Sequence, residues 1–211
     1  SDAIRLSERI SGLPGMLPEG GARNVARRDG MGVTLLDAAV TMKRMPDDYF
    51  QAIGSGTGGI AAWEASLRLR EDGRFGDRLP KLHLAQNLPF APMYYAWKAG
   101  RRDIIPDLDM PEAKKQIVAM YTDILSNRNP PYTVGGGVYD ALIDTRGETY
   151  AVTNDEAVRA KGVFEKAEGI DILPPAAVAV AALLQACDMG LDKERTVLLN
   201  ITGGGLERLG K

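Results

Sequence analysis

Residues 50–63 read FQAIGSGTGGIAAW, and they indicate the fold class more clearly than any other part of the chain. An apolar strand over 49–53 runs into four glycines within positions 54–59, and a helix from about 57 to 70 follows. Glycines at the start of a helix let backbone N–H groups close directly on an anion, usually a phosphate. The stretch therefore predicts a strand, a phosphate-binding turn and a helix in succession.

The rest of the chain also alternates strands and helices. Such alternation predicts one α/β domain over residues 1–211, a three-layer fold with a parallel sheet between helices on both faces. Ligands of such sheets bind at the carboxyl ends of the strands, where the glycine clusters 54–59 and 202–205 both fall. We expect strands at 49–53, 81–86, 170–173 and 196–201, helices at 33–43, 57–70, 111–126, 153–167 and 175–189, and loops at 11–32 and 127–137.

Composition excludes several classes of protein. The 211 residues carry a formal net charge of −2, which is no reason to expect nucleic acid, and no apolar run approaches the ~20 residues that span a bilayer. Cys187 is the single cysteine, so an internal disulfide is impossible and a cytoplasmic location is expected. His83 is the single histidine, so we expect no metal site and interpret His83 as structural. The first residues lack Met and a signal-like stretch, and we interpret them as a cut or processed end.

The glycine loop also fits the dinucleotide pattern G-x-G-x-x-G through Gly54, Gly56 and Gly59. A nicotinamide site would need an acidic residue at the end of the next strand to hold the ribose, and Gln86 and Asn87 stand there instead. Ile60 replaces the lysine that a nucleotide-hydrolysing P-loop would need. The pattern therefore argues against NAD and against nucleotide hydrolysis.

Two further segments carry groups that suit an anionic ligand. Thr202 follows an apolar strand and offers a hydroxyl at the same edge of the sheet as the glycine loop. Residues 20–30 read GGARNVARRDG, and Arg23, Arg27 and Arg28 would clamp a phosphate or another oxyanion by charge-assisted bonds. From composition alone, residues 202–205 can also be an ordinary strand-end loop, and an exposed arginine-rich loop such as 20–30 is usually only solvated.

In this order the segments resemble the second half of threonine synthase-like enzymes, the fold type II group that uses pyridoxal phosphate. GTGG at 56–59 looks like that family's cofactor-phosphate loop, and EGIDILPPAA at 168–177 looks like its E-G-I-x-x-E-P-A-S-A segment. LNITGGGL at 199–206 is similar to the T-G-x-G-L ending, whose threonine approaches the pyridine nitrogen. Residues 28–30 align with an R-x-E-G-Q-K-T stretch that grips substrate phosphate. Residues 20–32 and 54–64 look most similar to the family's L-cysteate-forming branch in methanogenic archaea.

The resemblance implies a fold, a cofactor and a set of site residues. The fold is that of the large domain of tryptophan synthase β-like enzymes, and the cofactor is pyridoxal 5′-phosphate. The cofactor-binding residues implied are Gly56, Thr57, Gly58, Gly59 and Thr202, with Gln86 and Asn87 as further neighbours at a strand's carboxyl end. Arg28, with Arg27 and Arg23 beside it, would hold the leaving phosphate or the incoming sulfite.

The same resemblance implies that the full enzyme converts O-phospho-L-serine and sulfite to L-cysteate and phosphate, a step of coenzyme M biosynthesis, as a homo-oligomer. The family's Schiff-base lysine lies well before the phosphate loop, and only Lys43 precedes the loop here, in a different setting. We therefore expect this chain to be the C-terminal part of a longer enzyme. Alone it would contain no catalytic residue and would be inactive, with the missing N-terminal part as its partner.

Departures from the family pattern bear on the alternatives. Leu173 and Ala176 replace a Glu and a Ser, so no polar role carries over there. Residues 30–32 lack the Gln-Lys-Thr of threonine synthase, which argues against O-phospho-L-homoserine as substrate. Three alternatives stay open at this point: a threonine synthase, a non-catalytic binding or assembly module, and an NAD oxidoreductase.

Overall fold

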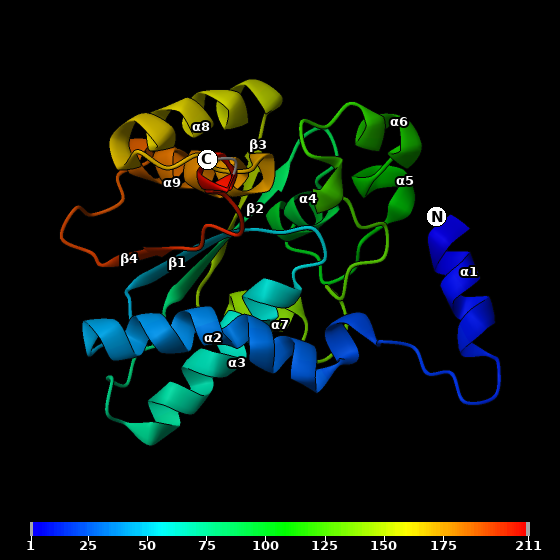
Figure 1. Cartoon of the computed structure of the whole chain (residues 1–211), viewed down its shortest axis with the longest axis horizontal. Coiled ribbons are helices and arrows are strands. Elements are labelled where there is room, and N and C mark those ends of the chain that lie inside the picture. Colours follow the sequence, from blue (N-terminus) through cyan, green and yellow to red (C-terminus); the bar gives the residue numbers. More distant parts are fainter. Residues whose placement is uncertain (1, 210–211) are drawn as a thin grey trace.

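A four-stranded parallel sheet forms the centre of the molecule (Figure 1). The computed structural model describes residues 2–209, with side chains from residue 6. The strands are β1 (Asp48–Ala52), β2 (Lys81–Asn87), β3 (Glu148–Val152) and β4 (Val197–Leu199), in the spatial order β3-β2-β1-β4. Every pair is parallel, which confirms the predicted α/β sheet.

Helices cover both faces of this sheet, so the predicted three layers are confirmed. Figure 1 shows α8 (Asn154–Glu168) and α9 (Pro174–Asp188) on one face. The other face carries α2 (Val25–Met42), α3 (Thr57–Asp72) and α7 (Val138–Asp144). The remaining elements are α1 (Asp2–Ser11), α4 (Pro92–Lys98), α5 (Pro106–Asp109), α6 (Ala113–Val118) and the 3-10 turns η1 (Gly21–Arg23), η2 (Asp123–Leu125) and η3 (Leu206–Arg208).

The alternation of side chains along β1 divides the core in two. Phe50 and Ala52 join the cluster on the α9 side, where a run of small buried residues over 176–182 lets α9 lie close to the sheet. Tyr49 joins the cluster on the opposite side, together with residues of α2 and α3. Successive residues of a strand point to opposite faces, so β1 contributes side chains to both clusters.

Helix α2 begins earlier than the sequence predicts. Residues 25–32 were expected to be loop, but Asn24 caps a helix there, its Oδ1 accepting from the backbone N–H of Arg27 at 3.2 Å. Gly32, which lowers helix propensity, is needed where α2 crosses α3. A Cβ at this position would lie 3.2 Å from the carbonyl oxygen of Ala61. The prediction of a loop over 11–32 was therefore wrong for residues 25–32, because glycine serves a helix–helix contact here.

Two other predicted elements also differ from the structure. The helix expected over 111–126 is helical only at α6 and the turn η2, because the backbone N–H of Tyr121 donates to Asn154 Oδ1 and that of Thr122 to Asn87 Oδ1. The strand expected over 170–173 is a single antiparallel bridge between Ile172 and Gly204. Strand β3 and the short helices α4 and α7 were not predicted.

A buried polar network joins the strands at their amino-terminal edge. Asp48, at the start of β1, is fully buried, and its carboxylate accepts hydrogen bonds from Arg195 Nε at 2.5 Å and from His83 Nε2 at 2.8 Å. The other ring nitrogen of His83 lies 2.7 Å from the hydroxyl of Tyr150 on β3. A neutral imidazole satisfies both contacts, donating to Asp48 and accepting from Tyr150. His83 is therefore structural, as predicted.

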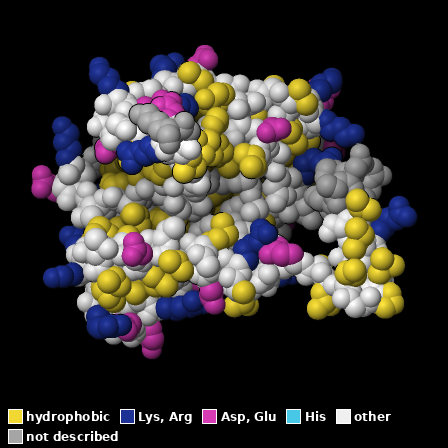
Figure 2. Space-filling model, viewed as in Figure 1, with side chains coloured by type: hydrophobic (Ala, Val, Ile, Leu, Met, Phe, Trp, Pro, Cys, Tyr) yellow, Lys and Arg dark blue, Asp and Glu magenta, His cyan; other side chains and the backbone are white. Residues whose placement is uncertain are grey.

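Helix α1 and the loop that follows it lie apart from the other elements (Figure 1). Figure 2 shows apolar side chains on their surface, and Leu6, Leu13 and Leu17 are 55%, 56% and 91% exposed. Within the part of the chain that the structure describes, no helix has the length and apolarity needed to cross a membrane.

The His83 network predicts a pH-dependent stability. Burial lowers the pKa of His83 against the opposing attraction of Asp48. As pH falls below about 6.5, the unfolded chain takes up a proton that the folded chain resists, so the free energy of unfolding decreases, by at most about 1.4 kcal/mol per pH unit. Chemical denaturation at pH 7, 6 and 5 measures this.

The matched variant is His83→Gln, whose amide can also donate to Asp48 and accept from Tyr150. Its stability should change less between pH 7 and pH 5 than that of the unmodified chain. Equal pH dependence in both proteins would contradict this account of His83.

Candidate functional site

The glycine loop lies at the carboxyl edge of the sheet, between β1 and α3. Gly56 is the N-cap of α3, with φ of 83° in the left-handed region, and no side chain caps the helix. Among the described residues, no acceptor is recorded for the backbone N–H groups of Gly56, Gly58 and Gly59. Unpaired N–H groups at the first turn of a 16-residue helix form an anion site, which the helix dipole reinforces.

Packing explains why these positions are glycines. A Cβ on Gly56 would lie 2.4 Å from Val138 Cγ2, one on Gly58 2.2 Å from Gln51 Nε2, and one on Gly59 2.9 Å from Leu84 Cδ1. The number of glycines is therefore not in itself a sign of a ligand, because a tight fit of α3 against its neighbours requires them. The unpaired N–H groups are the stronger sign of an anion.

Two hydroxyl groups complete the loop. Ser55 Oγ lies 2.9 Å from Thr57 Oγ1 and accepts a hydrogen bond from the Thr57 backbone N–H at 3.3 Å. Thr57 is 2% exposed, whereas Ser55 is partly exposed. Both hydroxyls can reorient toward an anion seated on the loop. The family motif, GTGG at 56–59, includes Thr57 but not Ser55, which precedes the motif by one position.

A chain of polar groups, half-buried at Asn200 and buried at Tyr49 and Gln51, connects β4 to the loop. Asn200 Nδ2 donates to the Tyr49 hydroxyl at 2.7 Å, and this hydroxyl donates to Gln51 Oε1 at 2.9 Å. The Gln51 amide in turn lies against Gly58. Burial raises the pKa of Tyr49 to about 12, so its hydroxyl stays protonated. Gln51 and Asn200 were missed, although Gln51 is conspicuous as a polar residue inside an apolar strand.

Thr202 lies near the carboxyl edge beside β1. Phe50 pairs with Leu199, and the backbone N–H of Asn200 donates to Phe50 O at 2.9 Å, which carries the parallel register toward the loop. Thr202 is exposed. Its hydroxyl is therefore available to a ligand at this edge.

Gln86 and Asn87 both end β2 at this edge but differ in their hydrogen bonds. Gln86 Oε1 accepts from the backbone N–H groups of Met93 and Tyr94 at 2.9 and 3.0 Å, at the start of α4. Its Nε2 is buried and has no partner among the described residues, so it can still donate to a bound group. Asn87 bonds Thr122, Val152 and Asn154 through its two polar atoms, and so holds neighbouring segments together.

The three arginines predicted to bind substrate do not share one position. Arg28 lies on α2, where its Nε donates to Glu64 Oε2 at 2.8 Å and its guanidinium also bonds Ala22 O. Arg27 pairs with Glu19 at 2.6 Å, and Arg23 is exposed on η1. Their role in binding phosphate or sulfite stays a prediction, since the structure shows Arg27 and Arg28 bonded within the chain.

Two further observations concern possible metal ligands and Lys43. Across residues 6–209 there is no group of three or more His, Cys, Asp and Glu side chains able to hold a metal ion. Lys43 is exposed at the C-terminus of α2 in a left-handed conformation, as the predicted solvated residue would be.

Comparison with known proteins decides the family. Residues 2–203 match the family model described as "Pyridoxal-phosphate dependent enzyme". The chain belongs to this family of pyridoxal-phosphate dependent enzymes. The residues at this edge of the sheet fit such a cofactor. A phosphate suits the unpaired N–H groups at the start of α3. Gln86 Nε2, at the end of β2, has no partner among the described residues and can donate a hydrogen bond to a bound group.

Curated relatives and solved structures agree with this family. The chain is 90% identical over 211 residues to "Cysteate synthase" of Methanocella paludicola, covering 100% of the chain and 49% of the relative. It is 72% identical to that of Methanocella arvoryzae, over 100% and 51%, and 66% identical to that of Methanosarcina mazei, over 99% and 50%. The chain thus spans about half the length of the curated relatives it matches.

Among solved structures, a threonine deaminase from T.th. has a TM-score of 0.54 at 16% identity, over 84% of this chain and 56% of that one. The serine racemase of Dictyostelium discoideum has a TM-score of 0.55 at 17% identity, over 83% and 49%. These likenesses confirm the predicted fold of the fold type II pyridoxal-phosphate enzymes.

The packing of the glycine loop generates a prediction for Gly56→Ala. This change places a Cβ at a positive φ and against Val138, so it should lower the free energy of unfolding by at least about 2 kcal/mol. It should also weaken the binding of pyridoxal phosphate, because the N–H groups of the first turn move. Denaturation and a pyridoxal phosphate titration measure the two effects.

The control is Gly162→Ala in the middle of α8, where a Cβ meets nothing within 4 Å. It should leave cofactor binding unchanged and raise stability by up to about 1 kcal/mol. Similar behaviour of the two variants would contradict the packing account of the loop.

Proposed function

We propose that this chain is one part of an enzyme that converts O-phospho-L-serine and sulfite to L-cysteate and phosphate with pyridoxal phosphate as cofactor. The observation that carries the proposal is the 90% identity to a cysteate synthase along the whole chain. The reaction would stand in coenzyme M biosynthesis, as the family resemblance implies. The homo-oligomeric state and the cytoplasmic location expected from the sequence stay predictions.

Residues of this chain would hold the cofactor by its phosphate and its ring. The backbone N–H groups of Gly56, Gly58 and Gly59 would bind the phosphate, with the hydroxyl of Thr57 beside them. The Thr202 hydroxyl would face the pyridine nitrogen. As a neutral group it would leave that nitrogen largely unprotonated, whereas a carboxylate would favour the pyridinium. Gln86 Nε2 supplies a further donor at the same edge.

Bound pyridoxal phosphate supplies an electron sink for the charge left when the α-proton is removed, which lets phosphate leave from Cβ and sulfite add there. The guanidinium group of Arg28, with those of Arg27 and Arg23, would bind the leaving phosphate and the incoming sulfite. A guanidinium suits both the departing phosphate and the arriving sulfite, because both are oxyanions of similar charge. To bind them, Arg28 would have to exchange Glu64 for the substrate.

A chimaeric enzyme tests the proposed reaction. This chain would replace the matching half of the Methanocella paludicola relative. The product is expected to release phosphate from O-phospho-L-serine only when sulfite is present, and to form L-cysteate. Phosphate release from O-phospho-L-homoserine with water would instead identify a threonine synthase and overturn the proposal.

The chain alone should bind the cofactor's phosphate without a covalent bond. Pyridoxal 5′-phosphate is expected to raise the melting temperature, and pyridoxal, which lacks the phosphate, is not. Borohydride reduction followed by mass spectrometry should find no lysine that retains the cofactor, because the family's Schiff-base lysine would lie outside residues 1–211. Stoichiometric trapping on one of the chain's lysines would refute this.

A further inference from the structure

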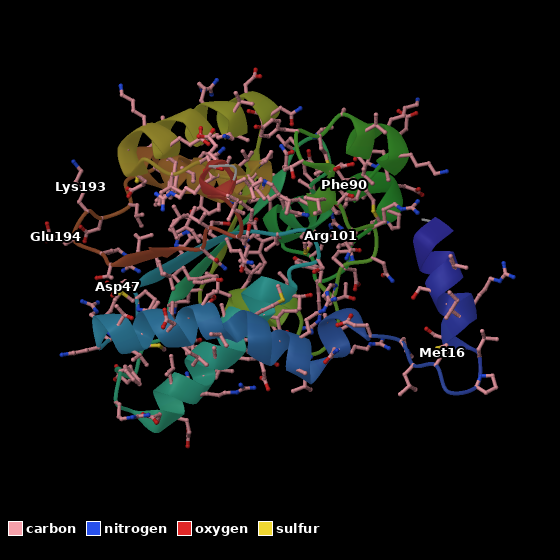
Figure 3. The ribbon with its side chains drawn as sticks, viewed as in Figure 1. Met16, Asp47, Phe90, Arg101, Lys193 and Glu194 are labelled. Atoms are coloured by element: carbon pink, nitrogen blue, oxygen red, sulfur yellow. The ribbon has the colours of Figure 1, made fainter. Side chains whose placement is uncertain are left out.

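A cavity of about 580 Å³ opens at the amino-terminal edge of the sheet, opposite the glycine loop. Figure 3 labels Asp47, which precedes β1, and Phe90, which follows β2, toward opposite ends of the sheet. The cavity lies on the Asp47 side, since its walls immediately precede β2 and β3 in the chain. It is lined by Arg70, Arg78, Leu79, Asp144, Thr145 and Arg146.

The charge of this cavity is positive. Arg70, Arg78 and Arg146 face one carboxylate, Asp144, so the lining carries two net positive charges. Within the described part of the chain, no hydrogen bond or ion pair of these three guanidinium groups is recorded. A neighbouring cavity of about 330 Å³ shares Arg78 and Leu79, but its other arginines are paired, Arg44 with Asp47 and Arg195 with Asp48.

Arg146 occupies a position that normally favours glycine. It follows α7 with φ of 50°, and its backbone N–H donates to Ile143 O while that of Gly147 donates to Leu142 O. These two bonds form a Schellman motif, in which the left-handed residue is usually glycine because a side chain is strained there. An arginine at this position places a guanidinium group at the wall of the cavity, where a glycine would present no side chain.

The remaining carboxylate is already engaged. Asp144 Oδ2 accepts a hydrogen bond from Trp63 Nε1 at 2.7 Å. This bond holds Asp144 toward α3, and it places an indole next to the cavity, where it can report on binding. The cavity is open to solvent, since Arg70, Arg78 and Arg146 are all exposed.

We propose that this cavity binds a small dianion that carries a phosphate group, through Arg70, Arg78 and Arg146. Two net positive charges match a phosphate monoester or inorganic phosphate, and guanidinium groups bind phosphate oxygens in a bidentate manner. The site does not depend on the proposed reaction, because it uses neither the glycine loop nor a residue assigned to the cofactor.

The test compares two glycine substitutions at strained residues. Arg146→Gly removes a guanidinium from the cavity and relieves the left-handed conformation, so the variant should fold at least as well as the unmodified chain. Lys43→Gly is the matched control, since Lys43 has φ of 57° and lies outside the lining. Calorimetric titrations use inorganic phosphate and adenosine monophosphate at constant ionic strength. Fluorescence of Trp63 in a Trp97→Phe background reports binding locally.

Saturable binding is expected in the unmodified chain and in Lys43→Gly, with affinity at least about tenfold weaker in Arg146→Gly. Arg78→Gln should weaken binding as well. Tighter binding of the nucleotide would identify a nucleotide source for the phosphate, and equal affinities would identify free phosphate. Responses no larger than those to chloride, or equal affinity in the two glycine variants, would overturn the proposal.

Discussion

The buried carboxylate of Asp48 is the contact on which the arrangement of the sheet depends. A carboxylate removed from water is costly unless charged and hydrogen-bonding partners surround it. Arg195 supplies the opposite charge from the turn before β4, and His83 supplies a hydrogen bond from β2. Tyr150 extends the contact to β3, and burial raises the pKa of its phenol, which keeps the hydroxyl a donor. One carboxylate thereby joins groups on or beside all four strands at their amino-terminal edge.

The parallel order of the strands brings a second set of polar groups together at the carboxyl edge of the sheet. The parallel strands end together, so the loop after β1, the end of β2 and the residues after β4 meet at one side of the sheet. The polar chain from Asn200 through Tyr49 to Gln51 supports this side from within, and Gln51 lies directly beneath Gly58. The N–H groups at the start of α3 are therefore held in place by packing before any anion binds, which lowers the entropic cost of binding.

The two edges of the sheet carry different chemistry. At the carboxyl edge, uncharged donors predominate: backbone N–H groups, the hydroxyls of Thr57 and Thr202, and the amide of Gln86. At the amino-terminal edge, arginines predominate, some paired with aspartates and three facing an open cavity. Uncharged donors suit a cofactor that must be held without disturbing its ring, whereas guanidinium groups suit a ligand recognised by charge.

Features that depend only on neighbouring residues could be predicted from the sequence. The strand–glycine–helix order at 50–63, the capping box at Thr153 and Glu156, and the apolar run of α9 are local patterns, and the structure has all three elements. The family resemblance could also be recognised from the sequence, since the motifs that carry it are short, continuous stretches of residues. The roles of Gly32 at a helix crossing and of Gly58 in making room for Gln51 became apparent only from the folded chain. The same holds for the ion pair of Arg28 with Glu64, and for the break in the helix expected over 111–126, where Asn87 and Asn154 bind the backbone. In each of these cases the partner lies far away in the sequence, and no local pattern carries its position.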